Sequence, residues 1–301
     1  MENRIGIFIN PKSGHGKGSR IQRMLTDARA RDPLLKNRVT AICATPASPA
    51  AIPAVIEALK GCDIALVCGG DGTVHQMADL IVRHAPETAL AVFPLGTGND
   101  FARQLGPRQK SVITHLQKIA VAPSFGMVDV WALNGELLFT NYVSFGFDGW
   151  VLSLYQSALK YLEQTGFFGF AFAKKMLFGL VGLWALLFHA KRAPMADGTP
   201  LSVIIGNLAW YGGGSRFGAG GKPDDGAIEL MKLPGNGAFL RMAASRFIPA
   251  LAPLAATHEP PLTLAFIDAV PLQVDGEDYS ARFATVRSFT VTRAGGIKVC
   301  A

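Results

Sequence analysis

The stretch CGGDGTVHQMADLIV at residues 68–82 decides the fold, because an apolar run meets a pair of glycines and then a helical pattern. The apolar run begins upstream, as DIALVCGG at 63–70, and is typical of a buried strand. Apolar residues then recur at helical spacing, at Val74, Met77, Ala78, Ile81 and Val82. Ligands of open α/β sheets bind beyond the carboxyl ends of the strands, where glycines admit a phosphate to the backbone and a helix offers its N–H groups. We therefore expect a phosphate-binding site at this junction.

Asp71 lies at the centre of this junction and has two interpretations. A lone carboxylate repels phosphate, so Asp71 either holds Mg²⁺ or acts on a proton. Alternatively it only caps the following helix, since Gly-Asp-Gly is also ordinary turn chemistry.

Two further glycine-rich segments follow predicted strands. FPLGTGNDFARQLG at 93–106 continues into a helix that begins near Asn99 or Asp100. NPKSGHGKGS at 10–19 follows the apolar strand 4–10. The second segment does not match a Walker A loop, because that motif requires G-x-x-x-x-G-K-[ST]. Three such segments in one parallel sheet converge on one edge.

The order of predicted elements defines two domains. Strands at 4–10, 38–45, 63–70 and 88–96 alternate with helices at 17–31, 49–60, 73–84 and from residue 100. This alternation predicts an α/β domain with a parallel Rossmann-like sheet over residues 1–125. After residue 125, apolar runs joined by Gly, Asn and Pro turns predict a β-rich antiparallel sandwich over 126–301. We leave open whether its last strand returns to the first domain.

Helical insertions interrupt the second domain, at about 150–162, 168–190 and 238–251. In the last of these, Phe239, Met242 and Phe247 form a stripe that we assign to the core.

Composition narrows the class of protein. The 301 residues are 50% hydrophobic and carry a formal net charge of +7, which suits anionic partners. The sequence shows no nucleic-acid recognition motif and no aromatic-basic stripe, so we expect no nucleic acid partner. The four cysteines lack zinc-site or disulfide spacing and indicate a reducing, cytoplasmic compartment. The segment MENRIGIFIN is expected to be a strand and not a signal peptide.

These motifs resemble those of a known enzyme family. NPKSG, GGDGT and PLGTGNDFAR, in this order, are similar to the catalytic domain of the diacylglycerol kinase family, whose superfamily includes sphingosine, ceramide and NAD kinases. The resemblance continues through NYVSFGFDGWV at 141–151, KPDDGAIEL at 222–230 and VDGED at 274–278, so it touches nearly the whole chain. It implies an ATP-dependent lipid kinase with a diacylglycerol kinase-like fold.

The resemblance also implies residue roles. The nucleotide-binding set would be Asn10, Ser13, Gly14, Thr45, Gly69, Gly70, Asp71, Gly72, Thr73, Val74, His75, Thr97, Asn99 and Asp100. Glu277 would be the general base on the lipid hydroxyl, with Asp275 and Asp71 as further catalytic candidates. From the residues alone, VDGED is more typical of a solvated hairpin turn, and only the family resemblance favours the catalytic interpretation.

A Mg²⁺ ion is implied beside the segment KPDDGAIEL. The matching positions are Lys222, Asp225 and Ala227. Asp225 would supply a carboxylate, whereas Lys222 and Ala227 would serve only through main-chain carbonyls, because an ammonium group does not ligate a cation. After GGDGTV the sequence departs from the family, since Gln76 and Asp79 stand where Glu and Asn are usual.

The lipid side of the prediction depends on residues 166–188. The phenylalanines Phe167, Phe168, Phe170 and Phe172 precede the apolar run Met176 to Phe188, which has basic flanks. Thirteen residues are too few to span a bilayer, so this run is either a buried helix or one that dips into one leaflet. We expect a peripheral enzyme at the cytoplasmic membrane surface, with a homodimer left open.

Three functions are compatible with these motifs. The first is transfer of phosphate from MgATP to a membrane lipid, with diacylglycerol as the family default. The second is a kinase of a soluble nucleotide-like or sugar acceptor that shares the GGDGT loop. The third is a non-catalytic protein that binds lipid or nucleotide on the same fold.

Overall fold

The computed structural model describes residues 2–106, 111–164, 171–218 and 221–301. The chain forms two compact units, one of residues 1–130 with 295–301 and one of residues 131–294. The predicted boundary between residues 125 and 126 falls inside a strand that belongs to both units, β5 (Phe125–Leu133). The division into a nucleotide domain and a lipid domain remains a proposal.

The first unit contains a parallel sheet. Its strands are β1 (Ile5–Ile9), β2 (Val39–Ala44), β3 (Ile64–Gly69) and β4 (Ala89–Pro94), in the order β2-β1-β3-β4. Val299 and Cys300, at the end of β16 (Ser288–Cys300), pair with β4 in parallel. The helices are α1 (Ser13–Arg31), α2 (Pro33–Arg38), η1 (Pro49–Ala51), α3 (Ile52–Lys60), α4 (Asp71–His84), α5 (Asp100–Gln104) and α6 (Val112–Val121).

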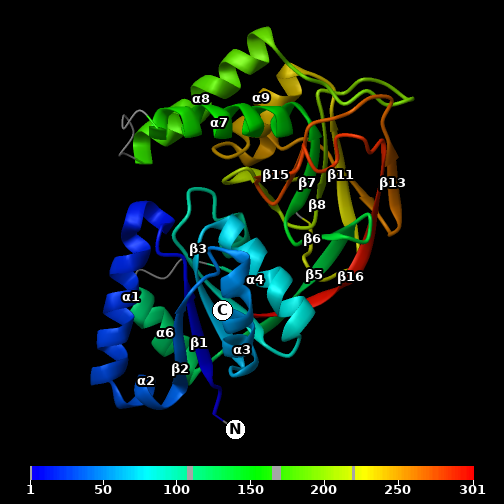
Figure 1. Cartoon of the computed structure of the whole chain (residues 1–301). Helices are drawn as coiled ribbons and strands as arrows, with labels where there is room; N and C mark the ends of the chain where they lie inside the picture. The colour runs from blue at the N-terminus through cyan, green and yellow to red at the C-terminus, as the bar shows by residue number, and fades with distance from the viewer. Residues whose placement is uncertain (1, 107–110, 165–170, 219–220) are drawn as a thin grey trace. The chain divides into compact units, whose positions relative to one another are not determined.

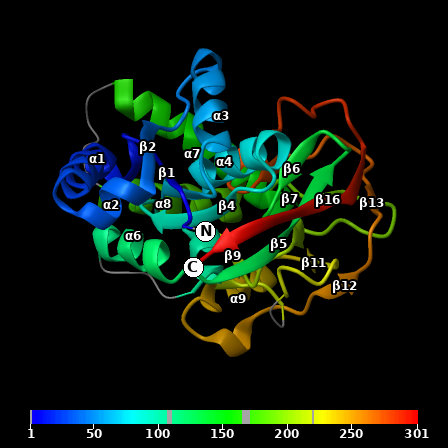
Figure 2. The ribbon, with the colours of Figure 1, turned by 90° about the horizontal axis from the view of Figure 1, so that it is seen from below.

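Both faces of β1, β3 and β4 are buried, which explains why these three strands are continuously apolar, whereas the edge strand β2 is partly exposed. Helices α1, α2 and α6 cover one face, and α3 and α4 cover the other (Figures 1 and 2). On the first face, side chains of alternate strand positions pack against Leu25, Leu35 and Leu116 of these helices.

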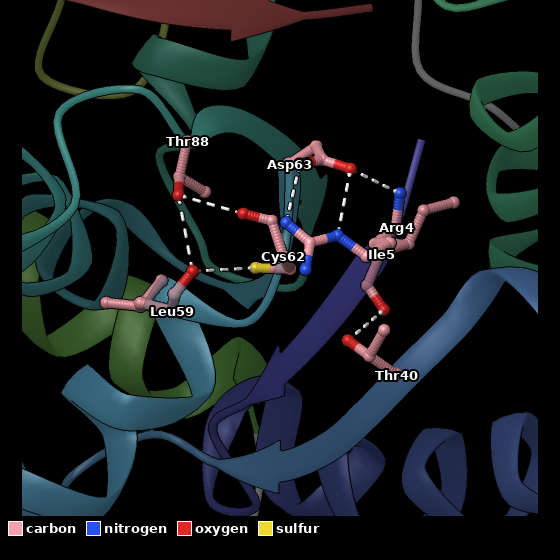
Figure 3. Close-up of polar contacts among 7 residues, drawn as sticks. All are labelled: Arg4, Ile5, Thr40, Leu59, Cys62, Asp63 and Thr88. Carbon is pink, nitrogen blue, oxygen red and sulfur yellow. Dashed lines mark hydrogen bonds and ion pairs between the residues drawn. The ribbon is translucent and has the colours of Figure 1, made fainter. Parts of the chain in front are cut away.

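Polar contacts join the amino-terminal ends of β1 and β3 (Figure 3). Arg4 forms an ion pair with Asp63 at 3.0 Å, and this pairing lowers the pKa of the Asp63 carboxyl. The buried Thr88 hydroxyl donates to the carbonyl oxygens of Leu59 and Cys62. The glycine-rich segments lie at the opposite, carboxyl-terminal ends of the strands.

The second unit is antiparallel. Its six-stranded sheet has the order β12-β11-β8-β7-β14-β15, and β9 pairs with β10. These strands are β7 (Tyr142–Gly146), β8 (Ser202–Gly206), β9 (Trp210–Tyr211), β10 (Ser215–Arg216), β11 (Ile228–Leu233), β12 (Ala256–His258), β14 (Leu272–Val274) and β15 (Glu277–Asp278). A further layer holds β6 (Leu137–Phe139), which pairs with β5, and β13 (Leu262–Ala265), which pairs with β16.

The core of the second unit lies on both sides of the six-stranded sheet. Val143, Phe145 and Val203 face a cluster with Trp131 and Phe289. Positions of the other parity, such as Tyr142 and Ile204, face a cluster that includes Met242. The helices are α7 (Phe147–Gln164), α8 (Ala171–Phe188), α9 (Asn236–Ala244) and η2 (Pro249–Leu251). The predicted α/β domain followed by an antiparallel β-rich domain with helical insertions is confirmed.

Several element boundaries differ from the predictions. α1 begins at Ser13 instead of residue 17, and α2 and α6 were not predicted. The helix predicted over 238–251 is wrong in its second half, because α9 ends at Ala244. The assignment of Phe247 to the core is also wrong, since its side chain is 80% exposed, whereas Met242 is buried and Phe239 is half-buried. Phe167, Phe168 and Phe170 lie outside the described residues, as does the side chain of Phe172.

Gly18 provides a test of the packing at the start of α1. A Cβ atom at Gly18 would lie 2.0 Å from the carbonyl oxygen of Asn10, whereas a Cβ at Gly61 would meet only ordinary contacts at 3.5 Å. We predict that Gly18→Ala lowers the free energy of unfolding by about 2 kcal/mol or more, because the backbone must shift. Gly61→Ala, the matched control, should change it by about 0.5 kcal/mol or less. Urea denaturation of the two variants measures the difference, and equal stabilities would contradict this packing.

Candidate functional site

The glycine-rich segments after β3 and β4 approach each other backbone to backbone. The amide of Leu95 donates to the carbonyl of Gly69 at 2.7 Å. A Cβ atom at Gly96 would lie 2.5 Å from the Cα of Gly70, so a side chain has no room at either glycine. The two loops therefore form one surface, at the end of the sheet where α4 begins.

The segment after β1 joins the same surface through Asn10. Its Nδ2 donates to the hydroxyl of Thr73 at 2.9 Å, and its amide donates to the carbonyl of Cys68 at 3.1 Å. A Cβ at Gly14 would lie 3.1 Å from the carbonyl oxygen of Leu95, so α1 begins beside the loop that follows β4. The convergence of three segments, predicted from the strand order, is thus present in the first unit.

Asp71 spans two of these loops. Its carboxylate accepts the amide of Asn99 at 2.5 Å and that of Phe101 at 3.3 Å. Asp71 therefore caps α5, the helix that follows the loop after β4, and it is also the first residue of α4. Its expected part in the chemistry remains a prediction, but the geometry gives it a clear positioning role.

Asn99 and Asp100 also have structural partners. Asn99 has a left-handed backbone (φ 56°), and its side-chain amide exchanges hydrogen bonds with both backbone groups of Gly96. The buried Asp100 forms an ion pair with Arg103 at 2.5 Å, and Arg103 also donates to the carbonyl of Gly98. Arg103 was missed from the sequence, although it stands within the motif PLGTGNDFAR.

The other predicted nucleotide residues differ in exposure. Thr97 is exposed at the tip of its loop, His75 is half-buried, and Thr73 and Val74 are buried. Thr45 is buried, and its amide donates to the carbonyl of Ile9. Ser13 and Gly72 are half-buried within the first turns of α1 and α4.

The two carboxylates of VDGED, in the second unit, have opposite environments. Asp275 and Gly276 form a two-residue hairpin turn between β14 and β15 with positive φ at both positions, 49° and 88°, as a type I′ turn requires. The buried Asp275 carboxylate accepts the amides of Thr140, Asn141 and Tyr142 at 2.9–3.1 Å. Glu277 is exposed at the start of β15. The segment is a hairpin turn, as one interpretation held, but Asp275 anchors it and is not solvated.

A buried polar network holds the strand before this turn. Gln273 of β14 donates to the carboxylate of Asp148 at 3.3 Å and to the hydroxyl of Tyr211 at 3.1 Å. Asp148 also accepts the hydroxyl groups of Ser202 and Tyr211. Burial, together with the charge of Asp148, raises the pKa of Tyr211 well above its ordinary value, so Tyr211 stays a donor. No periodic pattern in the sequence indicates this network.

The segment 222–229, where the resemblance implies a metal ion, carries carboxylates in two different environments. Lys222 and Asp225 are exposed, and Asp225 accepts the amide of Ala227 at 3.1 Å. Among the described residues, no group of three or more His, Cys, Asp or Glu side chains is arranged so that it could hold a metal ion. Glu229, however, is buried, and its Oε2 has no hydrogen-bond partner within the part of the chain that the structure describes. The carboxylates of Asp225 and Glu229 are the kind of oxygen ligand that a cation such as Mg²⁺ prefers.

Glu229 was missed from the sequence because AIEL is typical of an ordinary strand. Burial, with a contribution from the charge of Asp225, raises its pKa to about 7. A Cβ atom at Gly221 would lie 2.5 Å from Glu229 Oε2, so the glycine lets the backbone approach the carboxylate.

The architecture defines a class of protein: an α/β domain with glycine-lined strand ends, joined to an antiparallel β-rich domain. Residues 4–130 match the diacylglycerol kinase catalytic domain family, and this confirms the predicted resemblance. The match covers nearly the whole amino-terminal part of the first unit.

Curated relatives extend the same similarity. A protein from Chromohalobacter salexigens named "Probable lipid kinase YegS-like" is 32% identical over 169 residues, which cover 54% of this chain and 51% of that protein. A protein of the same name from Pseudomonas aeruginosa is 32% identical over 188 residues, which cover 60% and 58% of the two chains. The chain thus spans little more than half the length of the curated relatives it matches.

Solved structures share the whole fold. A crystal structure of a diacylglycerol kinase from Bacillus anthracis str. Sterne has a TM-score of 0.60 and 17% identity and covers 99% of this chain and 93% of its own. A second structure from that organism has a TM-score of 0.66 at the same identity and covers 99% and 98%. At this identity the similarity establishes the fold.

Substitution of the two carboxylates of the hairpin should have different effects on the stability of the protein. Asp275→Ala removes the acceptor of three buried amides, so we predict a loss of about 3 kcal/mol or more in the free energy of unfolding. Glu277→Gln changes an exposed side chain and should leave the melting temperature unchanged. Thermal unfolding measures both, and an Asp275→Ala protein as stable as the wild type would contradict the anchoring role.

Glu229 should make stability depend on pH. Its pKa of about 7 in the folded chain lies above the ordinary value, so the folded state binds more protons and stability falls as pH rises from about 4.5 to 7. The loss attributable to this group is at most about 3 kcal/mol. In EDTA, Glu229→Gln should remove this component, so the difference in melting temperature between variant and wild type should grow from pH 5 to pH 8. A difference independent of pH would show that Glu229 is not held in this environment.

Proposed function

We propose that this protein is an ATP-dependent lipid kinase, which transfers the γ-phosphate of MgATP to a hydroxyl group of a membrane lipid, diacylglycerol or a related lipid. The observation that carries the proposal is the backbone contact between Gly70 and Gly96, in the unit that matches the diacylglycerol kinase catalytic domain. The names of the curated relatives support the lipid as acceptor.

The nucleotide phosphates would lie along the glycine-lined loops. Phosphoryl transfer depends mainly on positioning and charge stabilisation, and the amino end of α4 offers backbone N–H groups and a positive dipole. The exposed hydroxyl of Thr97 would donate to a phosphate oxygen. Asp71 would hold the loop after β4 in place by accepting hydrogen bonds from the amides of Asn99 and Phe101.

The acceptor would be activated by Glu277. As the lipid hydroxyl oxygen forms its bond to the γ-phosphorus, the bond from that phosphorus to the bridging oxygen of ADP breaks, and Glu277 takes the hydroxyl proton. An exposed carboxylate on a hairpin fixed by Asp275 suits this role. Asp275 suits it less, because its oxygens already accept three amides.

Mg²⁺ would be held in the second unit by Asp225 and Glu229, with main-chain carbonyls at Lys222 and Ala227. The ion would supply positive charge that offsets carboxylate and phosphate charge at the site. The positive charge would also favour the ionised form of Glu229.

The lipid would be reached from a membrane surface through α8. This helix buries Ala185 and Leu186, and it exposes Met176, Phe178, Leu180, Leu183, Trp184, Leu187 and Phe188. Such a face fits a helix that lies in the interface of a bilayer. Within the described residues, no helix is long and apolar enough to cross a membrane. We propose a peripheral enzyme at the cytoplasmic membrane surface.

The reaction can be tested with radiolabelled ATP, Mg²⁺ and a panel of lipids in mixed micelles. We predict a phosphorylated lipid with wild type and a loss of at least about 100-fold with Glu277→Gln, in line with the usual contribution of a general base. Glu259→Gln, at an exposed glutamate of the same unit, is the matched control and should retain full activity. ATP binding without any phosphorylated lipid would contradict the proposal and favour a soluble acceptor. The same assay with a panel of nucleosides and sugars would then test that alternative.

A further inference from the structure

The segment that contradicted the sequence prediction forms a distinct surface on the second unit. Beyond the buried side of α9, four large apolar side chains are exposed: Leu240 by 54%, Phe247 by 80%, Ile248 by 54% and Leu254 by 92%. We call these residues, with Arg241 and Arg246, the 240–254 surface. Arg241 and Arg246 are exposed as well, and the guanidinium of Arg246 lies 5.8 Å from the ring centre of Phe247.

The exposure of this surface is enforced by a defined backbone. The buried Ser245 hydroxyl donates to the carbonyl of Met242 at 2.5 Å and accepts the amide of Arg216 at 2.8 Å. The amides of Phe247 and Ile248 both donate to the carbonyl of Ala244. A turn tied to β10 in this way directs the next apolar side chains outward, away from the cluster that Met242 joins.

The charge of the segment is one-sided. Residues 236–258 contain two arginines and no aspartate or glutamate. Apolar tips flanked by arginines match the interfacial region of an anionic bilayer, where the tips enter the acyl boundary and the guanidinium groups meet lipid phosphates. A two-fold contact between two copies through the same surface would instead bring four arginines together without an acidic partner from the segment.

Helix α9, in which this surface begins, packs against the end of α8. Asn236, the first residue of α9, donates to the carbonyl of Leu186 at 3.2 Å. Phe239 packs edge-on against Phe147 at 4.9 Å, in the cluster that contains Ala185 and Leu186. Helices α8 and α9 are therefore neighbours within the second unit (Figure 1).

We propose that the 240–254 surface is a second membrane contact, in which Phe247, Ile248 and Leu254 enter an anionic bilayer while Arg241 and Arg246 bind its phosphate groups. The inference deepens the proposed function, on which it rests for its lipid partner. It assigns the attraction to anionic lipid to α9 and the turn that follows it, separately from the apolar face of α8.

The test is sedimentation of the full chain with lipid vesicles. One set contains phosphatidylcholine alone, and the other contains phosphatidylcholine with about one third phosphatidylglycerol, a composition that gives a negative surface potential. The variants are Phe247→Ser with Ile248→Ser, and Arg241→Gln with Arg246→Gln. Ile267→Ser is the control, because Ile267 is 64% exposed elsewhere in the same unit.

The two double variants should fail in different ways. Loss of the two apolar side chains that would enter the bilayer should weaken binding to anionic vesicles by about tenfold or more. Loss of both arginines should reduce the preference for anionic over neutral vesicles by about tenfold or more. The control should bind as the wild type does, and circular dichroism should show all proteins folded.

Three results would overturn the proposal: anionic binding unchanged in both double variants, an equal loss in the control, or a wild-type dimer that both double variants abolish. Phosphorylation of a short-chain lipid below its micellar concentration separates this question from the proposed function. Activity there in wild type and both double variants, with vesicle binding unchanged, would reject the surface alone. Vesicle binding that depends on the surface, with no phosphorylation of any lipid, would reject the kinase assignment alone.

Discussion

The contact on which the first unit depends is the approach of Gly70 to Gly96. Because neither glycine has a side chain, the two backbones come close enough for the amide of Leu95 to donate to the carbonyl of Gly69. The same approach brings the carboxylate of Asp71 within reach of the amide of Asn99 in the loop after β4. The parallel sheet supplies the geometry, since its strands end at the same edge. Everything assigned to phosphate binding follows from this edge being lined by main chain.

The carboxylates of the second unit have different roles because their surroundings differ. Asp275 is buried and saturated by amides, so it sets the shape of a turn. Glu277, two residues on, is exposed and suited to exchange a proton. Glu229 is buried with an oxygen that lacks a hydrogen bond among the described residues, which is a costly state that the proposed cation would relieve. The chemistry of each group is thus decided by backbone context that the residue type alone does not reveal.

Much of the fold was predictable, since β1, β3 and β4 are short apolar runs followed by glycine, and the family resemblance extended this to both domains. Asp71 was harder, because the amides that donate to its carboxylate lie 28 and 30 residues away in the sequence and no local pattern indicates them. Phe247 was assigned to the core on helical spacing, yet α9 ends at Ala244, where the hydrogen bonds of Ser245 turn the chain. Asp148, Tyr211 and Gln273 come from separate strands and one helix, so only the tertiary fold brings them together.

The last strand has a consequence for biosynthesis. Cys300 is fully buried in the core of the first unit, and with Val299 it extends the sheet beside β4. As the chain leaves the ribosome, residues 1–130 emerge before this strand and lack it until residues 299 and 300 have been made. During that interval the edge of β4 is open to other chains. The pairing that completes the first unit is among the most distant in sequence, which favours slow, late closure and a need for protection of the nascent chain.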